Sequence, residues 1–259
     1  MTERPPTIAL FVTCLVDLMR PSVGFAALRL LERAGAQVVV PQKQTCCGQP
    51  AYNSGDEANA CAIAKQVIEV FENFETVVIP SGSCGGMIKE HYPKLLAGDA
   101  GWQKRAEDLA ARTQELTQYL SANLNLNEVS STVKGTVTYH DSCAGLRELG
   151  IKEQPRKLLA TVDGLELKEM DDTESCCGFG GLFSIKYPDV SGAIVDKKVD
   201  NIEAQNTDMV SGGDLGCLMN VAGKLKRRGS NVRVYHIAEI LAGMTDQPGL
   251  GDALGDGDR

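Results

Sequence analysis

The chain has 259 residues, which is long enough for one large domain or two ordinary domains, each with a hydrophobic core. Its 34 acidic and 26 basic residues give a formal net charge of −8, so nucleic acid and anionic membranes are not expected partners, because both attract clustered lysine and arginine. The apolar runs are shorter than the ~18 to 20 residues that cross a bilayer, and the first leads into Asp17 rather than a small-residue cleavage site, which together predict a cytoplasmic protein.

Predicted strands and helices alternate along the chain. Apolar or β-branched runs predict strands at residues 7–13, 37–41, 76–80, 136–139, 165–170, 207–210 and 232–235. Apolar side chains at helical spacing predict helices at residues 21–34, 54–74, 102–120, 151–160, 189–205 and 218–228, with a short helix after the last strand. This alternation is typical of α/β proteins with a mostly parallel sheet, in which ligands gather at the carboxyl edge of the strands.

Eight of the nine cysteines follow predicted strands and obey one duplicated spacing rule. Each of the first four has a counterpart 129 to 133 residues later, and the pairs are Cys14 and Cys143, Cys46 and Cys176, Cys47 and Cys177, and Cys84 and Cys217. Chance does not produce such a repeat. We therefore predict two pseudo-symmetric units, residues 1–125 and 126–245, each with a small mostly parallel sheet flanked by helices. A disordered acidic tail is predicted at residues 246–259.

The adjacent cysteines of the two Cys-Cys-Gly turns do not suit internal disulfides. Neighbouring Cα atoms lie about 3.8 Å apart, whereas a disulfide usually joins Cα atoms ~4.4 to 6.8 Å apart. In a chain of this size that is not expected to be secreted, metal ligation or redox chemistry is the better interpretation. Four thiolates per unit suit an iron–sulfur cluster or tetrahedral zinc, and the candidate ligands are Cys14, Cys46, Cys47, Cys84, Cys143, Cys176, Cys177 and Cys217.

The remaining cysteine and two histidines have plainer interpretations. Cys61 has no counterpart and lies within a predicted helix, so we expect it in the core. His140 precedes Cys143 by three residues and is either a hydrogen-bonded loop residue or a group that orients a ligand or handles a proton. His236 ends a strand and is expected to satisfy local backbone groups. No GxGxxG sequence, Walker motif or nucleophile elbow is present, so nucleotide binding and serine-hydrolase chemistry are not expected.

The spacings C-x31-CC-x36-C and C-x32-CC-x39-C resemble the duplicated CCG cysteine-rich domain found in the cysteine-rich subunit of heterodisulfide reductase. More closely, the chain resembles the lactate utilisation protein A family, and the resemblance covers nearly the whole chain apart from the tail. The matching stretches are Phe11-Val-Thr-Cys14, Gln44-Thr-Cys-Cys-Gly-Gln-Pro50, Pro80-Ser-Gly-Ser-Cys84, Tyr139-His-Asp-Ser-Cys143, Cys176-Cys-Gly-Phe-Gly-Gly-Leu-Phe-Ser184 and His236-Ile-Ala-Glu239.

The resemblance implies an iron–sulfur or redox subunit of a cytoplasmic complex that oxidises L-lactate to pyruvate, an oxidoreductase component that does not act alone on lactate. It implies one or two clusters of the 4Fe–4S type and partner subunits that include a ferredoxin-like iron–sulfur protein. The chain departs from the heterodisulfide reductase repeat because Met87 and Asn220 stand where a fifth thiol of a CxxC pair is expected. Zinc in one repeat, a thiol–disulfide enzyme and a zinc-stabilised scaffold subunit remain open alternatives.

Overall fold

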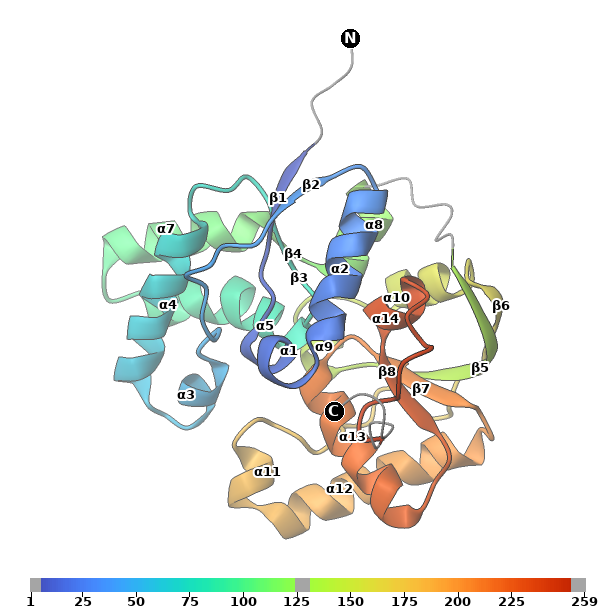
Figure 1. The fold of residues 1–259 in the computed structure, drawn as a ribbon. Coiled ribbons are helices and arrows are strands. Elements are labelled where there is room, and N and C mark those ends of the chain that lie inside the picture. Colours follow the sequence, from blue (N-terminus) through green and yellow to red (C-terminus); the bar gives the residue numbers. More distant parts are fainter. Residues whose placement is uncertain (1–5, 124–130, 253–259) are drawn as a thin grey trace.

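The structure, a computed structural model that describes residues 6–123 and 131–252, contains two four-stranded parallel sheets flanked by helices (Figure 1). The strand order is β2-β1-β3-β4 in the first sheet and β6-β5-β7-β8 in the second. The two orders are equivalent, because the first strand of each unit lies between the second and third strands and the fourth lies at the far edge. The predicted α/β class and its two similar parallel-sheet units are confirmed.

The first sheet and its helices lie between residues 7 and 123. Its strands are β1 (Thr7–Leu10), β2 (Gln37–Val39), β3 (Val77–Ile79) and β4 (Thr113–Glu115). Its helices are α1 (Cys14–Met19), α2 (Pro21–Arg33), α3 (Gln49–Asn53), α4 (Glu57–Phe71), α5 (Gly82–Gly86), the π-helical turn η1 (Met87–His91), α6 (Tyr92–Leu95), α7 (Ala100–Arg112) and α8 (Leu116–Asn123).

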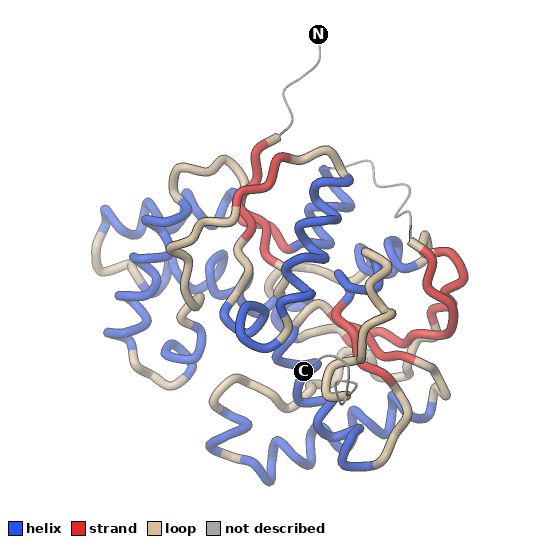
Figure 2. The backbone as a smooth tube through the Cα atoms, viewed as in Figure 1, coloured by secondary structure: helices blue, strands red, loops and turns tan. Residues whose placement is uncertain are grey.

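The second sheet repeats this plan. Its strands are β5 (Thr132–His140), β6 (Asp163–Leu167), β7 (Met209–Gly212) and β8 (Arg233–His236). Its helices are α9 (Cys143–Arg147), α10 (Glu153–Leu159), α11 (Phe183–Lys186), α12 (Pro188–Ala204), α13 (Leu215–Arg228) and α14 (Ile237–Leu241). Figure 2 shows the two groups of strands as separate red segments with helices around them.

Alternating side chains of the first sheet enter two different hydrophobic clusters. Ile8 and Leu10 pack with α2 and α8, whereas Ala9 and Phe11 pack with α4, η1 and α7. This is the two-residue period of a strand that is buried on both faces, as parallel strands usually are. The cluster around α2 continues into the second unit through Val137 and α14, so the two sheets share part of one core.

The prediction of one helix over residues 102–120 is wrong. α7 ends at Arg112, β4 then pairs in parallel with β3, and α8 begins at Leu116. The three residues of β4, Thr-Gln-Glu, carry no strand pattern of their own, so pairing with β3 decides their conformation. Glu115 starts the next helix because its Oε2 accepts hydrogen bonds from the N–H groups of Thr117 (2.7 Å) and Gln118 (3.2 Å). Burial raises the pKa of Glu115 to about 7.

The structure describes part of the predicted C-terminal tail but not the predicted boundary between the two units. Of the predicted tail, residues 246–252 lie against β8, where the N–H of Leu250 donates to the carbonyl of Val234 at 2.8 Å, so this part of the chain is ordered on the second sheet. Residues 253–259 of the tail and residues 124–130 around the predicted unit boundary lie outside the described residues. In the described part of the chain, no helix is long and apolar enough to cross a membrane.

The two units meet close to the cysteine loops. A Cβ atom added to Gly82 of α5 would lie 2.9 Å from the Cα of Gly145 in α9, so the two short helices touch backbone to backbone. The buried Asp214 of the second unit accepts a hydrogen bond from the N–H of Ser83 in the first (2.7 Å). Arg20, which directly follows α1, pairs with the buried carboxylate of Glu239 in α14 at 2.8 Å. These contacts place the cysteine-bearing edges of the two sheets next to each other.

Candidate metal centres

The eight repeated cysteines all lie at the carboxyl edges of the two sheets, four at each. Cys14 and Cys143 are the first residues of α1 and α9, which follow β1 and β5. Cys84 and Cys217 are the third residues of α5 and α13, which follow β3 and β7. The Cys-Cys-Gly turns follow β2 and β6. Because parallel strands present their carboxyl ends on one edge, segments remote in sequence converge there.

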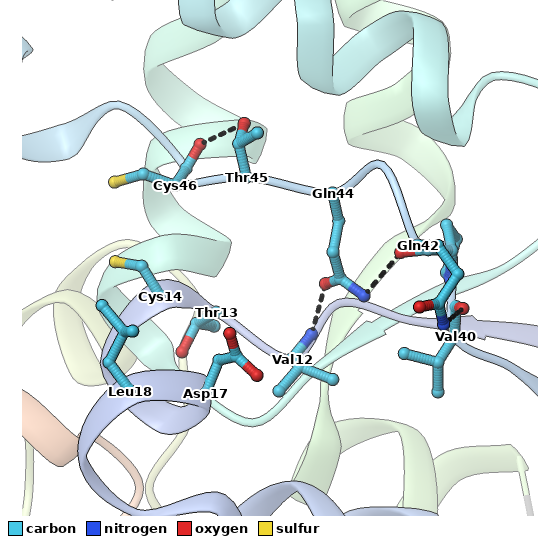
Figure 3. A pocket seen from close by; sticks show the side chains of 11 residues that line it. Val12, Thr13, Cys14, Asp17, Leu18, Val40, Gln42, Gln44, Thr45 and Cys46 are labelled. Carbon is cyan, nitrogen blue, oxygen red and sulfur yellow. Dashed lines mark hydrogen bonds between the residues drawn. The ribbon is translucent and has the colours of Figure 1, made fainter.

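The first site is formed by Cys14, Cys46, Cys47 and Cys84. The thiol of Cys46 is hydrogen bonded to those of Cys14 and Cys47, and Cys47 is also hydrogen bonded to Cys84. Figure 3 shows the side chains of Cys14 and Cys46 extending to the same side, with their sulfur atoms one above the other. Cys47 and Cys84 are buried, and the other two are partly exposed.

Three thiols of the first site, those of Cys14, Cys46 and Cys47, favour a single thiolate when no cation is bound. Hydrogen bonds from Cys14 and Cys47 lower the pKa of Cys46 to about 3. The hydrogen bond to Cys46 and burial raise the pKa values of Cys14 and Cys47. Further thiolates in this space would repel one another, and a metal centre would remove that repulsion. The donor set therefore fits a metal or cluster that binds several thiolates together.

Backbone and side-chain contacts fix the first Cys-Cys-Gly turn. Gly48 adopts a φ of 82°, and its N–H donates to the Sγ of Cys46 at 3.4 Å. The hydroxyl of Tyr92 donates to the carbonyl of Cys47 at 2.7 Å. The amide of Gln44 accepts from the N–H of Val12 at 2.8 Å, which ties the turn to the end of β1 (Figure 3). Gln44 belongs to the stretch Gln44–Pro50 that carries the family resemblance, but its contact with Val12 could not be predicted from the sequence.

Two pockets reach the first site from different sides. One has a volume of about 330 Å³, is drawn in Figure 3, and is lined by residues that include Asp17 and Gln44. The other, also about 330 Å³, lies between the first-site cysteines and residues of the second unit. Those second-unit residues are Phe179, Gly181, Leu182, Ser184, Ile185, Asp214, Leu215 and Gly216. The loop after the second Cys-Cys-Gly turn therefore covers the first site.

The second site contains Cys143, Cys176, Cys177 and Cys217 in a looser arrangement. Cys177 is hydrogen bonded to the thiols of Cys176 and Cys217. Cys143 and Cys176 are exposed, and Cys177 and Cys217 are buried. The pKa of Cys176 is raised by its hydrogen bond to Cys177 and by burial, and burial raises the pKa of Cys143. Unlike the first site, the second has no cysteine whose pKa is lowered.

The second Cys-Cys-Gly turn has the same backbone support as the first. The N–H of Gly178 donates to the Sγ of Cys176 at 3.3 Å, and that of Phe179 donates to the Sγ of Cys177 at 3.5 Å. Asn220, which replaces an expected thiol, donates from Nδ2 to the carbonyl of Cys177 at 2.8 Å. Asn220 therefore holds the turn through its backbone, as Tyr92 does in the first unit.

His140 lies among the thiols of the second site. One ring nitrogen and the Sγ atoms of Cys177 and Cys217 all lie within 4.8 Å of one another. The side chain is 1% exposed, and neither ring nitrogen has a hydrogen-bond partner among the described residues. Burial lowers the pKa of His140 to about 3, so the imidazole is neutral at physiological pH. The ring therefore lies beside two candidate ligands, as the second interpretation expects, and the backbone of Thr173 is the backbone group that acts on it.

Lys198 is a further charged residue at the second site that the sequence interpretation misses. It is fully buried in α12, and its Nζ donates to the carbonyls of Asp172 (2.7 Å) and Thr173 (3.1 Å), just before the Cys-Cys-Gly turn. Burial lowers its pKa to about 8. The sequence could have indicated its burial, because Lys198 adjoins the apolar stripe formed by Val195, Val199 and Ile202 on the same helix.

The two remaining expectations agree with the structure. Cys61 packs against the core around α4 and donates to the carbonyl of Leu95 at 3.6 Å, away from both sites. The Nδ1 of His236 accepts from the N–H of Ala238 at 3.2 Å and caps α14, so this histidine satisfies local backbone.

Comparisons with known proteins agree with this architecture. Residues 8–89 and 137–222 each match the family described as CCG, Cysteine-rich domain, which defines the chain as a protein with two CCG domains. The chain is 48% identical to Lactate utilization protein A of Geobacillus sp. (strain WCH70), over 90% of this chain and 98% of that protein. It is 44% identical to Lactate utilization protein A 2 of Bacillus cereus (strain 03BB102), over 91% and 97%. The chain belongs to the Lactate utilization protein A family.

A solved structure shares the fold. A hypothetical protein from Helicobacter pylori aligns with 94% of this chain at a TM-score of 0.62 and 11% sequence identity. This chain spans 50% of that protein's length. At such low identity the likeness concerns the fold alone.

Proposed function

We propose that the protein is a redox component of lactate utilisation that works with partner proteins to oxidise L-lactate to pyruvate. The observation that carries the proposal is 44% to 48% identity, over nearly the full length of the relatives, to proteins named Lactate utilization protein A. The convergence of four thiols at each sheet edge supports a role in which bound metal takes part. We further propose that the protein acts in the cytoplasm.

The first site is the better candidate for an iron–sulfur cluster. Such a cluster, when held by four cysteine thiolates, supplies one-electron transfer. Cys14, Cys46, Cys47 and Cys84 would be its ligands, and the N–H of Gly48 donates to the Sγ of Cys46 and would stabilise negative charge there. The partly exposed Cys14 and Cys46 open onto two pockets, which gives electrons a short route to a partner.

Neither pocket at the first site suits lactate itself. The described residues that line the two pockets include Asp17 and Asp214 but neither lysine nor arginine. A substrate carboxylate is usually held by arginine or lysine and is repelled by an acidic side chain. Lactate binding is therefore assigned to a partner protein, and a ferredoxin-like iron–sulfur protein is the partner proposed for electron transfer.

Replacing Cys46 with serine is expected to abolish the cluster of the first site. After anaerobic purification and reconstitution, the unmodified chain is expected to bind about four iron and four sulfide ions at this site, because a 4Fe–4S cluster uses four thiolates. Iron and sulfide assays and the visible absorption spectrum measure the loss. Cys61→Ser is the matched control, since Cys61 lies outside both sites. Fewer than about one iron per reconstituted chain would remove the cluster proposal.

Growth on lactate tests the biological part of the proposal. A Bacillus strain that lacks its own Lactate utilization protein A is expected to regain growth on L-lactate when it expresses this chain. The Cys46→Ser chain is expected to fail, whereas Cys61→Ser is expected to restore growth. If the unmodified chain accumulates in the cell but growth does not return, the role in lactate utilisation is contradicted.

Thiol–disulfide exchange at Cys46 is a second candidate function, favoured by the lowered pKa of this thiol. In the metal-free protein, Cys46 is expected to be a thiolate throughout pH 5 to 8, so its alkylation rate by iodoacetamide stays nearly constant. The pKa of Cys176 is raised, so its rate is expected to rise about tenfold per pH unit in that range. Mass spectrometry of the alkylated peptides separates the two. A tenfold rise per unit at Cys46 as well would exclude a preformed thiolate and with it this candidate.

A further inference from the structure

We propose that the second site binds a single zinc-like divalent ion through His140, Cys177 and Cys217, and does not hold a second cluster. The inference rests on the proposed function only in taking the cysteine sites as metal centres. It adds that the two sites differ in kind, although the sequence repeat makes their cysteines equivalent.

The spacing of the three groups fits one ion. Two ligands of one tetrahedral zinc lie roughly 3.5 to 3.8 Å apart, as follows from Zn–S and Zn–N bonds of about 2.3 and 2.0 Å. The ring nitrogen of His140 and the two Sγ atoms all lie within 4.8 Å of one another, so they need to approach by at most about 1 Å to bind one ion. A four-iron cluster attaches its cysteines to different iron atoms and holds them further apart. In the described part of the chain, no three thiols of the first site lie this close.

The environment of His140 favours a role as a metal ligand rather than a role in packing. A buried imidazole normally has hydrogen-bond partners, because an unsatisfied buried polar group costs about 1 to 3 kcal/mol. His140 is 1% exposed and neither ring nitrogen has a partner within 3.5 Å among the described residues, the backbone of Thr173 being the backbone group that acts on the ring. Coordination through one nitrogen would satisfy that atom. The residue of the first unit that corresponds to His140 is the buried Phe11, which precedes Cys14 by three residues as His140 precedes Cys143. An apolar ring is therefore sufficient for packing at this position, and packing alone does not explain an imidazole there.

Lys198 is a second residue by which the second site differs from the first. The buried residues of α4 and α12 match one for one, from Ala60 and Ser191 to Phe71 and Ile202, and in this alignment Val67 corresponds to Lys198. Lys198 Nζ donates only to neutral acceptors and no ion pair among the described residues includes it; Asp172 and Cys177 offset part of the lowering of its pKa by burial, but without ion-pair contact. A buried cation without an anionic partner is costly. A metal centre held by three or more thiolates carries net negative charge and would attract this lysine, so Lys198 supports bound metal at the second site, whereas the imidazole of His140 is the feature that favours zinc; apolar Val67 places no such cation near the first site.

The coordination has room for a fourth ligand. Cys143 and Cys176 are exposed and lie beside the three buried groups, so one of these thiols or a water completes the tetrahedron. Metal binding forms the Zn–N and Zn–S bonds and releases the protons of the coordinating thiols to solvent, with no transfer of electrons.

X-ray absorption of the zinc-loaded full chain tests the inference in a Cys46→Ser/Cys84→Ser background, which removes two ligands of the first site. The expected spectrum contains both sulfur ligands at about 2.3 Å and a nitrogen ligand at about 2.0 to 2.1 Å with imidazole scattering. His140→Phe uses the residue that the first unit tolerates at this place. It is expected to remove the imidazole signal and weaken zinc binding by at least about 10-fold to 100-fold. Lys198→Met is expected to weaken zinc binding several-fold and to keep the imidazole signal.

Three results would overturn the inference. They are an all-sulfur zinc shell, an unchanged zinc affinity in His140→Phe that still unfolds cooperatively, and about four iron and four sulfide ions bound at the second site after reconstitution of the background variant. The last result leaves the proposed redox function intact, because it shows a cluster where zinc is expected. Loss of iron from the first site in the chain with both sites complete would contradict the proposed function while leaving the zinc site standing.

Discussion

Replacing Arg156 with methionine is expected to lower the free energy of unfolding by about 3 to 5 kcal/mol, because it leaves a buried carboxylate without its partner. Arg156 binds Asp141 through two parallel hydrogen bonds of 2.9 Å each, and the side chain of Asp141 is 0% exposed. It also binds Glu169 at 2.6 Å. Methionine fills a similar volume, so the lost charge pairing dominates the effect. Urea unfolding followed by circular dichroism measures it.

The same change is expected to disturb the second site. The backbone N–H of Asp141 donates to the carbonyl of Thr173 at 3.2 Å, which joins the loop before Cys143 to the loop before Cys176. When Asp141 loses Arg156, both loops lose a common anchor. Zinc affinity of the second site is therefore expected to fall together with stability, whereas iron binding at the first site is expected to persist in the folded fraction.

Arg228→Met is the matched control for Arg156→Met. Arg228 pairs with Asp196, Asp200 and Glu203 on the surface between α12 and α13, where these carboxylates are 35% to 66% exposed. Solvent-exposed pairs contribute about 0 to 1 kcal/mol each, so the loss is expected to be smaller. The double variant Asp141→Asn/Arg156→Met is expected to recover part of the loss, because it removes the unpaired charge. Equal losses for the two arginines would contradict the assignment of the effect to burial.

The locations of the two cysteine clusters can be predicted from the sequence because they depend on strong patterns. Alternating strands and helices predict parallel sheets, and parallel sheets gather the residues after their strands at one edge. The duplicated spacing of Cys46-Cys47 and Cys176-Cys177 then predicts two such edges. The structure agrees with both patterns, since each unit has a parallel sheet and its four cysteines follow the carboxyl ends of strands.

The chemistry of each site depends on contacts that no pattern carries. β4 has no strand signal of its own and forms because β3 offers it an edge, although its counterpart β8 is predictable. Thr13, directly before Cys14, adopts a φ of 70°, a conformation that β-branched residues rarely take and that sequence pattern does not reveal. The nearness of His140 to Cys217 likewise depends on how β5 and β7 pair. Such long-range pairing decides which of two similar cysteine sets receives a nitrogen ligand.

Replacing Gly178 with alanine is expected to destabilise the protein by about 2 to 5 kcal/mol and to weaken metal binding at the second site. Gly178 has a φ of 78°, where an L-residue costs roughly 1 to 2 kcal/mol. A Cβ atom there would lie 2.7 Å from the carbonyl oxygen of Ser191, and relieving such overpacking costs about 1 to 3 kcal/mol more. The turn has to move, which breaks the 3.3 Å hydrogen bond from the N–H of Gly178 to the Sγ of Cys176.

Gly55→Ala separates the two contributions to this loss. Gly55 has nearly the same φ, 79°, but nothing lies within 4 Å of the position that its Cβ would take. Only the conformational cost applies there, so the expected loss is about 1 to 2 kcal/mol, with zinc affinity unchanged. Denaturant unfolding and zinc titration of both variants measure the difference. Equal stability losses would mean that the contact with Ser191 relaxes freely, and the Cys-Cys-Gly turn would then owe its shape to backbone conformation alone rather than to close packing against α12.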